Sequence, residues 1–365
     1  MEIHHPDGNR HLDSYPDQLG SHFLHETALK ILPYLLQVRE FFRIFAGDFE
    51  DMWLEIVLII VCFAVVLWGA DRFTDGACGL ARRLNVSELV IGLTIVSLGT
   101  SLPEFIVSLM SVLRNSSDMS VGNILGSNIF NILVIIGASS IMRTIKVRDL
   151  QLRRHFAVCL FVSSMLWFFA YTEGTIQRWE GFLLAAFFCV YIYMTYQIAA
   201  KDRKAVLSQD GEEQKQEMTM LRIILFIIVG MAALVGGGRV LVENAAAFAR
   251  EIGISESVIG MTILAGGTSL PELATSVIAA RKGSYGLSLG NAIGSNIFNV
   301  AFVIGTCGSF VQMPVTEITQ IDWYVFVGSV MLTWLVASTG HKLDKKEGIL
   351  LVLCYLAYLT WLLLR

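Results

Sequence analysis

A segment of 40 residues occurs twice in this chain, and this repeat constrains the fold more than any other feature. Residues 92–131 read GLTIVSLGTSLPEFIVSLMSVLRNSSDMSVGNILGSNIFN, and residues 260–299 read GMTILAGGTSLPELATSVIAARKGSYGLSLGNAIGSNIFN. The copies are 168 positions apart without a gap, and they share GTSLPE and GN-x-x-GSNIFN. A carboxylate stands in the middle of each copy, Glu104 and Glu272. Such a long repeat predicts a chain of two related units, and an ionisable residue in an apolar span is a candidate functional group.

The composition is that of a polytopic membrane protein. Of 365 residues, 55% are hydrophobic and 16% are charged, whereas soluble chains are about one quarter charged. The apolar runs reach the roughly 20 residues that cross a bilayer. Six cysteines show no C-x-x-C spacing, so we expect them to be reduced, buried and inert. The absence of metal-hydrolase, nucleophile-elbow and phosphate-loop motifs gives no support to an enzyme, and we expect no cofactor and no nucleic-acid partner.

Ten candidate spans predict an all-α fold of ten transmembrane helices. They lie near 53–70, 86–112, 119–141, 156–171, 180–199, 221–242, 254–280, 286–310, 322–338 and 348–364. GTSLP breaks the second and seventh spans, because its Gly and Pro interrupt the backbone hydrogen bonds; we expect the others to be ordinary helices. Five spans on each side of the polar loop 200–220 predict two inverted five-helix repeats, 52–199 and 221–365, with repeated segments at 92–141 and 260–310.

The basic residues predict the orientation. Alternate loops carry 18 Lys and Arg residues, beginning with Arg72, Arg82 and Arg83, whereas the opposite loops carry five. Because basic loops stay in the cytoplasm, we expect the 200–219 loop to be cytoplasmic and both ends of the bundle to lie outside. We expect the protein to reside in the plasma (cytoplasmic) membrane, surrounded by lipid.

Residues 1–51 differ from the rest of the chain. They hold five of the seven histidines, which suggests either a metal site or a poorly ordered tail, and we favour the tail. Residues 26–46 could form an amphipathic surface helix, although Pro33 interrupts it. Met52 directly precedes the first span and is a natural start, so we interpret 1–51 as an extension without a transport role.

Oxygen-bearing residues recur at fixed spacing within the repeat. Thr100 and Glu104 are four apart, as are Ser127 and Asn131, so each pair would share a helix face. The second copy repeats them as Thr268, Glu272, Ser295 and Asn299. With backbone carbonyls freed at Ser97 and Ala265, these residues predict a ring of oxygens at the bilayer centre. An all-oxygen ring suits hard cations such as Ca²⁺ and Na⁺.

The charge of this ring favours exchange. Two carboxylates in a low-dielectric cavity repel each other unless cations neutralise them. One Ca²⁺, two Na⁺ or two protons would each do so. The site can therefore accept different cargoes but resists being empty.

Other repeated polar residues have a structural interpretation. Asn123, Asn128, Asn291 and Asn296 are expected to bridge helices rather than to touch an ion. Glu88 and Glu256 stand at helix starts, where acids suit the helix dipole.

The paired motifs resemble those of the calcium/cation antiporter superfamily, and of prokaryotic-type sodium/calcium exchangers in particular. The resemblance extends from about residue 53 to the C-terminus and is strongest in 92–141 and 260–310, which correspond to the alpha repeats of that family. It implies ten helices, inverted repeats and alternating access. It also implies the following ion ligands: Thr100, Ser101, Glu104, Ser127, Asn131, Thr268, Ser269, Glu272, Ser295, Asn299 and the carbonyls of Ser97 and Ala265.

One position departs from part of that family. Some archaeal and potassium-dependent members carry aspartate where this chain has Asn299, which weakens the case for potassium co-transport. The sequence thus predicts exchange of Ca²⁺ for Na⁺, with proton-coupled exchange and a cation channel as alternatives.

Overall fold

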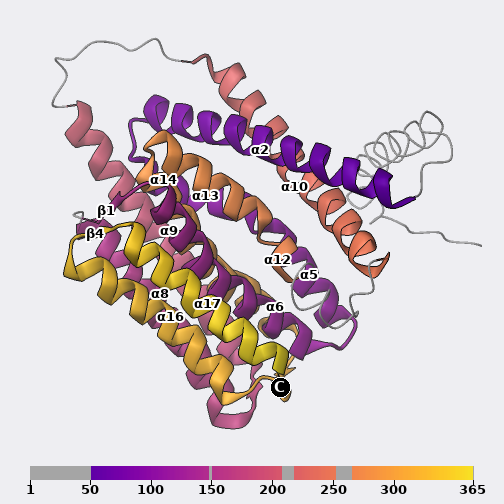
Figure 1. Ribbon diagram of the computed structural model, residues 1–365. Helices are drawn as coiled ribbons and strands as arrows, with labels where there is room; N and C mark the ends of the chain where they lie inside the picture. Colours follow the sequence, from indigo (N-terminus) through magenta and orange to yellow (C-terminus); the bar gives the residue numbers. More distant parts are fainter. Residues whose placement is uncertain (1–50, 148–149, 208–217, 252–264, 365) are drawn as a thin grey trace, which may run out of the picture. The chain divides into compact units, whose positions relative to one another are not determined.

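The computed structural model describes residues 51–147, 150–207, 218–251 and 265–364 (Figure 1). The chain divides into two compact units, Met1–Leu54 and Glu55–Arg365, and nearly all described residues belong to the second. Eight described helices are long and apolar enough to cross a membrane, and one bent helix pair makes a ninth if it is counted as one span. The prediction of an all-helical polytopic protein is confirmed. The span predicted at 254–280 begins outside the described residues, so the count of ten stays a prediction.

Three other predictions concern residues beyond the described ranges. These are the histidine-rich tail with its amphipathic stretch, Glu256, and residues 208–217 of the 200–219 loop.

The described elements fall on either side of residues 208–217, and the helix that ends at Leu207 extends into the predicted loop. Those before it are α2 (Asp51–Leu84), α3 (Glu88–Ile91), η1 (Gly92–Val96), α4 (Ser97–Thr100), α5 (Leu102–Leu113), α6 (Ser117–Phe130), η2 (Asn131–Ile135), α7 (Ile136–Met142), β1 (Ile145–Lys146), α8 (Leu150–Glu173), β2 (Thr175–Ile176) and α9 (Arg178–Leu207). Those after it are α10 (Met220–Glu251), α12 (Ala265–Gly267), α13 (Leu270–Lys282), α14 (Tyr285–Ile297), η4 (Phe298–Ile304), α15 (Gly305–Phe310), β3 (Met313–Pro314), α16 (Gln320–Thr339), β4 (Lys342–Leu343) and α17 (Lys345–Leu364).

Helix α2 is longer than the predicted span 53–70, because its buried face continues through Phe73, Ala77 and Ala81 at a spacing of four residues. That spacing keeps the three side chains on one side of a helix. The assignment of Arg72, Arg82 and Arg83 to a loop is therefore wrong: all three lie in α2.

Both GTSLP motifs break a helix in the same way. The helices Glu88–Thr100 and Leu102–Leu113 are bent by 46°, and Ser101 between them has φ −86° and ψ 9°. Ser269 has φ −90° and ψ 8° before α13. In each copy proline is the second residue of the following helix. It has no N–H for the carbonyl four residues earlier, and its ring crowds that carbonyl.

The third and eighth spans are not the ordinary helices that we expected. The π-helical segments η2 and η4 interrupt them, beginning at Asn131 and at Phe298. A π turn displaces side chains from the 3.6-residue pattern and is often found at functional sites. Asn131 opens one segment, and Asn299 is the second residue of the other.

Two small antiparallel pairings connect the halves of the chain. β1 pairs with β4, and β2 pairs with β3. The strands β1 and β3 are repeat equivalents, since Ile145 and Met313 are 168 positions apart. They nevertheless lie at opposite ends of α8, because β1 precedes this helix and β3 pairs with the strand that follows it. A helix of 24 residues separates them by about 36 Å.

Helix α14 and its continuation lie at the centre of the described helices. In the most apolar stretch of the span Tyr285–Phe310, 94% of residues are buried, against 11% in Lys345–Leu364. The first of these spans therefore contacts protein, and the second has the exposure of a helix that faces lipid. Polar side chains on α14 can consequently be satisfied by neighbouring helices.

Candidate cation-binding site

Glu104 and Glu272 occupy equivalent positions just after the two helix breaks. Glu104 is the third residue of α5 and Glu272 the third residue of α13. Both side chains have no exposed surface. The first turn of a helix is a favourable place for a carboxylate, because unpaired backbone N–H groups and the helix dipole stabilise negative charge there. The breaks therefore create two buried helix starts and place one acid on each.

Each carboxylate is hydrogen-bonded by a serine of the other repeat. Ser101 Oγ donates to Glu272 Oε1 at 2.9 Å, and Ser269 Oγ donates to Glu104 Oε1 at 3.1 Å. The two donors are the residues at the breaks. This reciprocal arrangement brings both carboxylates and both breaks into a single site, as the repeat predicted.

The second oxygen of each carboxylate is left without a partner. Oε2 of Glu104 and Oε2 of Glu272 are buried and accept no hydrogen bond from the described residues. Six more oxygens with this property form repeat-related pairs: Ser120 Oγ with Ser288 Oγ, Ser127 Oγ with Ser295 Oγ, and Asn131 Oδ1 with Asn299 Oδ1. An unsatisfied buried polar group costs about 1–3 kcal/mol, and more if it is charged. Ser120 and Ser288 stand seven residues, about 10 Å along the helix, before Ser127 and Ser295. The candidate ligands for cations are therefore the other six oxygens: two from carboxylates, two from hydroxyls and two from amides.

Four asparagines fix the orientation of the amide ligands. Asn131 Nδ2 donates to Asn296 Oδ1 and Asn299 Nδ2 donates to Asn128 Oδ1, both at 3.0 Å. Asn128 Nδ2 donates to the carbonyl of Asn296 at 3.2 Å, and Asn296 Nδ2 donates to the carbonyl of Asn128 at 3.0 Å. Because each ligand amide is held through its nitrogen, its oxygen remains unpaired. The prediction that Asn128 and Asn296 bridge helices is confirmed.

The remaining pair of asparagines also bridges helices. Asn291 Nδ2 donates to Ser276 Oγ at 2.9 Å, and Asn123 Nδ2 donates to Ser108 Oγ at 3.2 Å. Thr100 Oγ1 lies 3.1 Å from Asn291 Oδ1 and from the carbonyl of Val96. The hydroxyl of Thr100 therefore donates its proton to a protein acceptor, whereas the lone pairs of Thr100 Oγ1 remain available to a cation.

Two details of the expected ligand ring require correction. The carbonyl of Ser97 is not freed by the break, because it accepts the N–H of Ser101 at 3.0 Å. Proline at position 103 removes the donor for Gly99 instead. Thr100 and Glu104 do not share a face of one helix, because the bend at Ser101 separates them.

The second copy is described in part at the same place. Thr268 is half-buried in the turn between α12 and α13, and Ala265 is the first residue of α12. Their roles as ligands stay predictions.

Sequence analysis predicted Asn128 and Asn296 as helix bridges but missed that they orient Asn131 and Asn299, and it missed Ser108 and Ser276. Ser108 and Ser276, like Asn128 and Asn296, lie at equivalent repeat positions, and this equivalence was the available signal. Within the part of the chain that the structure describes, no group of three or more His, Cys, Asp or Glu residues could hold a metal ion. The donor set of two carboxylates, amides and hydroxyls suits Ca²⁺ or Na⁺ rather than a soft metal.

Comparisons with known proteins agree with this chemistry. The family model described as "Sodium/calcium exchanger protein" matches residues 54–197 and 222–364. The sodium/calcium exchanger MaX1 of Methanosarcina acetivorans is 29% identical over 339 residues, covering 83% of this chain and 97% of the relative. The inner membrane protein YrbG of Escherichia coli is 33% identical over 323 residues, covering 85% and 98%.

A solved structure has the same fold. The sodium-calcium exchanger NCX_Mj matches with a TM-score of 0.72 at 29% identity, covering 84% of this chain and 97% of the matched chain. The similarity thus extends over both repeats and over nearly the whole length of these proteins.

Proposed function

Because the chain belongs to the sodium/calcium exchanger protein family, we propose that it exchanges Ca²⁺ for Na⁺ across the membrane at the site around Glu104 and Glu272. The chain is a multi-pass membrane protein of an antiporter family. What we propose beyond family membership is the identity of the exchanged ions and the place where they bind.

The main support for this proposal is the pair of buried carboxylates, each with only one of its two oxygens hydrogen-bonded by the described residues. Each has one oxygen held by a serine of the other repeat and one oxygen without a partner among the described residues. Two negative charges without cations would be strongly destabilised in a buried site. One Ca²⁺ or two Na⁺ would neutralise them, so cargo of one kind can leave only as the other arrives.

The proposed mechanism is alternating access by two inverted five-helix repeats. Two observations support the inversion: β1 and β3 are equivalent in the repeat but lie at opposite ends of α8, and the serine–carboxylate bonds are reciprocal. Inverted repeats with broken helices at mid-membrane are typical of secondary transporters. The excess of basic residues predicts a cytoplasmic 200–219 loop with both ends of the bundle outside.

The proposed role of each residue follows from the buried oxygens that have no hydrogen-bond partner among the described residues. Glu104 and Glu272 supply the negative charge, whereas Asn131, Asn299, Ser127 and Ser295 supply neutral oxygens. Thr100, Ser101, Thr268 and Ser269 position the carboxylates or complete the shell, together with the carbonyl of Ala265 and the second lone pair of the Ser97 carbonyl, whose first accepts the N–H of Ser101. YrbG is named an inner membrane protein, and we propose the cytoplasmic membrane for this chain.

Transport into liposomes tests the proposal. Purified protein is reconstituted, and uptake of radioactive Ca²⁺ is measured with Na⁺ inside, with K⁺ inside, or with an acidic interior. We expect uptake only with internal Na⁺. Uptake driven equally by the pH gradient would indicate proton coupling, and uptake driven by voltage alone would indicate a channel.

Variants locate the site in the same assay. Glu104→Gln and Glu272→Gln should each abolish uptake, because either leaves one negative charge for a divalent ion. Glu243→Gln is the matched control, since Glu243 is an exposed glutamate of α10. If either site variant retains near-normal uptake, the paired-carboxylate site is wrong.

A further inference from the structure

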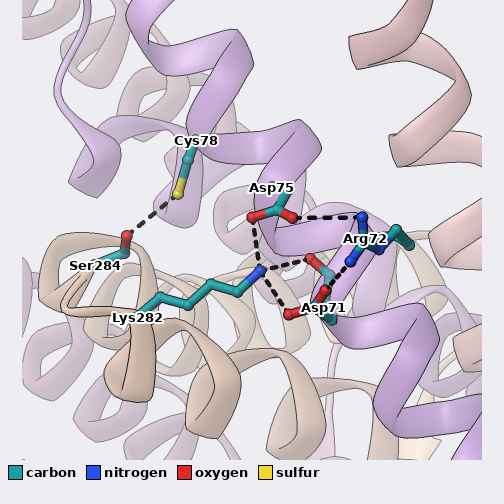
Figure 2. Close-up of polar contacts among 6 residues, drawn as sticks. All are labelled: Asp71, Arg72, Asp75, Cys78, Lys282 and Ser284. Carbon is teal, nitrogen blue, oxygen red and sulfur yellow. Dashed lines mark hydrogen bonds and ion pairs between the residues drawn. The ribbon is translucent and has the colours of Figure 1, made fainter. Parts of the chain in front are cut away.

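A charged cluster joins α2 to the end of α13 (Figure 2). Lys282 is the last residue of α13. Its Nζ donates to Asp75 Oδ1 at 2.6 Å and to the carbonyl of Asp71 at 3.0 Å, and it lies 2.7 Å from Asp71 Oδ1. The two aspartates are four residues apart on α2 and therefore face the same way.

Arg72 is the fourth charged residue of the cluster, and it pairs with the two aspartates of its own helix. It lies 2.5 Å from Asp71 Oδ2 and 3.9 Å from Asp75 Oδ2, and its guanidinium lies over the ring of Phe226 on α10 at 5.3 Å. The cluster is thus balanced, with two positive and two negative groups. Lys282 is the member that comes from a helix of the cation site, since α13 also carries Glu272.

A residue between the two aspartates lies beside a helix break. Phe73 lies between them on α2 and has no exposed surface. A Cβ added to Gly99 would meet Met231 Cε of α10 first and would lie 3.9 Å from Phe73 Cζ. Gly99 directly precedes Thr100 and Ser101, and Ser101 donates to Glu272. The segment of α2 that Lys282 binds therefore places Phe73 beside the first break, next to Met231 of α10.

The other repeat lacks this bridge in the described residues. The repeat equivalents of Asp71, Asp75 and Lys282 are Arg239, Glu243 and Arg114. Arg239 and Glu243 pair with each other within α10 at 2.8 Å, and both are more than half exposed. Among the described side chains, no ion pair joins Arg114 to α10. The two equivalent helix contacts therefore differ in charge although their GTSLPE motifs are identical.

We propose that Lys282 is a positioning residue for ion exchange: its ammonium ties α2 to α13 and keeps Phe73 beside the first break. This bridge must open before ions can pass on that side of the site. The inference rests on the proposed alternating-access exchange. Because the other repeat has no such bridge in the described residues, the charges favour the state that is closed on the Lys282 side.

A native cysteine can report the separation of the two helices. Cys78 lies on α2 one turn beyond Asp75, is 7% exposed, and has its Sγ 3.3 Å from Ser284 Oγ (Figure 2). Ser284 is two residues beyond Lys282. Opening of the bridge would part Cys78 from Ser284 and expose the thiol.

Alkylation of Cys78 by a water-soluble maleimide tests the proposal on the full chain in detergent. The modification of each cysteine is quantified by peptide mass spectrometry. The parent protein unfolded in denaturing detergent gives the reference for complete labelling. Cys159 is fully buried and should react only if the protein unfolds.

We expect Lys282→Gln to react at Cys78 about fivefold faster than the parent protein, as the loss of a small, partly exposed ion-pair network predicts. Lys282→Arg should restore the parental rate, because its guanidinium can still bridge the aspartates. Arg114→Gln, the repeat-equivalent control, should leave the rate unchanged. The double variant Asp71→Asn, Asp75→Asn should match Lys282→Gln, and combining the two should add nothing.

Unchanged labelling in both Lys282→Gln and the aspartate double variant would overturn the proposal, as would an equal increase in Arg114→Gln. If Cys159 also reacts in Lys282→Gln, that variant is unfolded and the aspartate double variant decides the outcome. Labelling requires no transport, so failure of this inference is distinguishable from failure of the proposed exchange.

Discussion

Replacing Asn128 by leucine should destabilise the protein by removing two side-chain hydrogen bonds while keeping the volume. Asn128 Nδ2 donates to the carbonyl of Asn296 at 3.2 Å, and its Oδ1 accepts from Asn299 Nδ2 at 3.0 Å. Hydrogen bonds between membrane helices contribute about 0.6 kcal/mol each. The two bonds together therefore contribute about 1 kcal/mol. The loss rises to about 3 kcal/mol if Asn299 Nδ2 finds no new partner.

A double-mutant cycle measures the contact itself. Asn128→Leu and Asn299→Ala remove the same hydrogen bond, so unfolding in denaturing detergent should give a coupling free energy of about 0.6 kcal/mol, and at most about 1.7. Asn128→Leu with Asn123→Ala is the matched control, since Asn123 donates to Ser108 and not to Asn128 or Asn296. A coupling as large in the control pair as in the first pair would refute the assignment of this bond.

Three further outcomes are expected. Glu272→Gln should weaken Ca²⁺ binding, measured by calorimetry, by about 2–5 kcal/mol, which is about 30-fold to several thousand-fold; an unchanged affinity would remove Glu272 from the site. Asn299→Asp adds a charge to the ring and should alter the dependence of Ca²⁺ uptake on Na⁺ and K⁺ more than protein abundance; identical dependence in mutant and parent would count against a ligand role. Gly290→Ala places a Cβ 2.7 Å from the carbonyl of Leu89 and should lower stability by about 1–3 kcal/mol, whereas Gly236→Ala, with no described atom within 4 Å of its new Cβ, should show no loss; equal thermal midpoints for both would refute this packing.

The repeat was sufficient to predict the two acids and their joining in one site. Glu104 and Glu272 stand in identical hexapeptides, so symmetry alone implied equivalent surroundings. The partner of each acid was not predictable. Ser101 is close to Glu104 in the sequence but donates to Glu272, because the contact depends on how two broken helices from different halves cross.

Spacing rules failed where the backbone departs from an ideal helix. The relation between Thr100 and Glu104 assumed one continuous helix, whereas the bend at Ser101 lies between them. The π-helical segments beginning at Asn131 and Phe298 were also missed. An apolar pattern does not distinguish a π turn from an α turn, since both bury nearly the same side chains. By contrast, the spacing of Ser127 and Asn131 held, because the Asn131 N–H still bonds the carbonyl of Ser127.

The similarities and the differences between the repeats have separate physical consequences. Where the copies agree, as at Ser101 and Ser269, each half completes the other's carboxylate, so neither half forms the site alone. Such agreement makes the two sides of the site energetically alike. The copies differ at Lys282 and Arg114. Among the described residues, Lys282 forms ion pairs with the aspartates of α2, and no ion pair joins Arg114 to the equivalent helix α10. A transporter with equivalent sides would populate both access states equally, so residues outside the shared motif must set any preference between them.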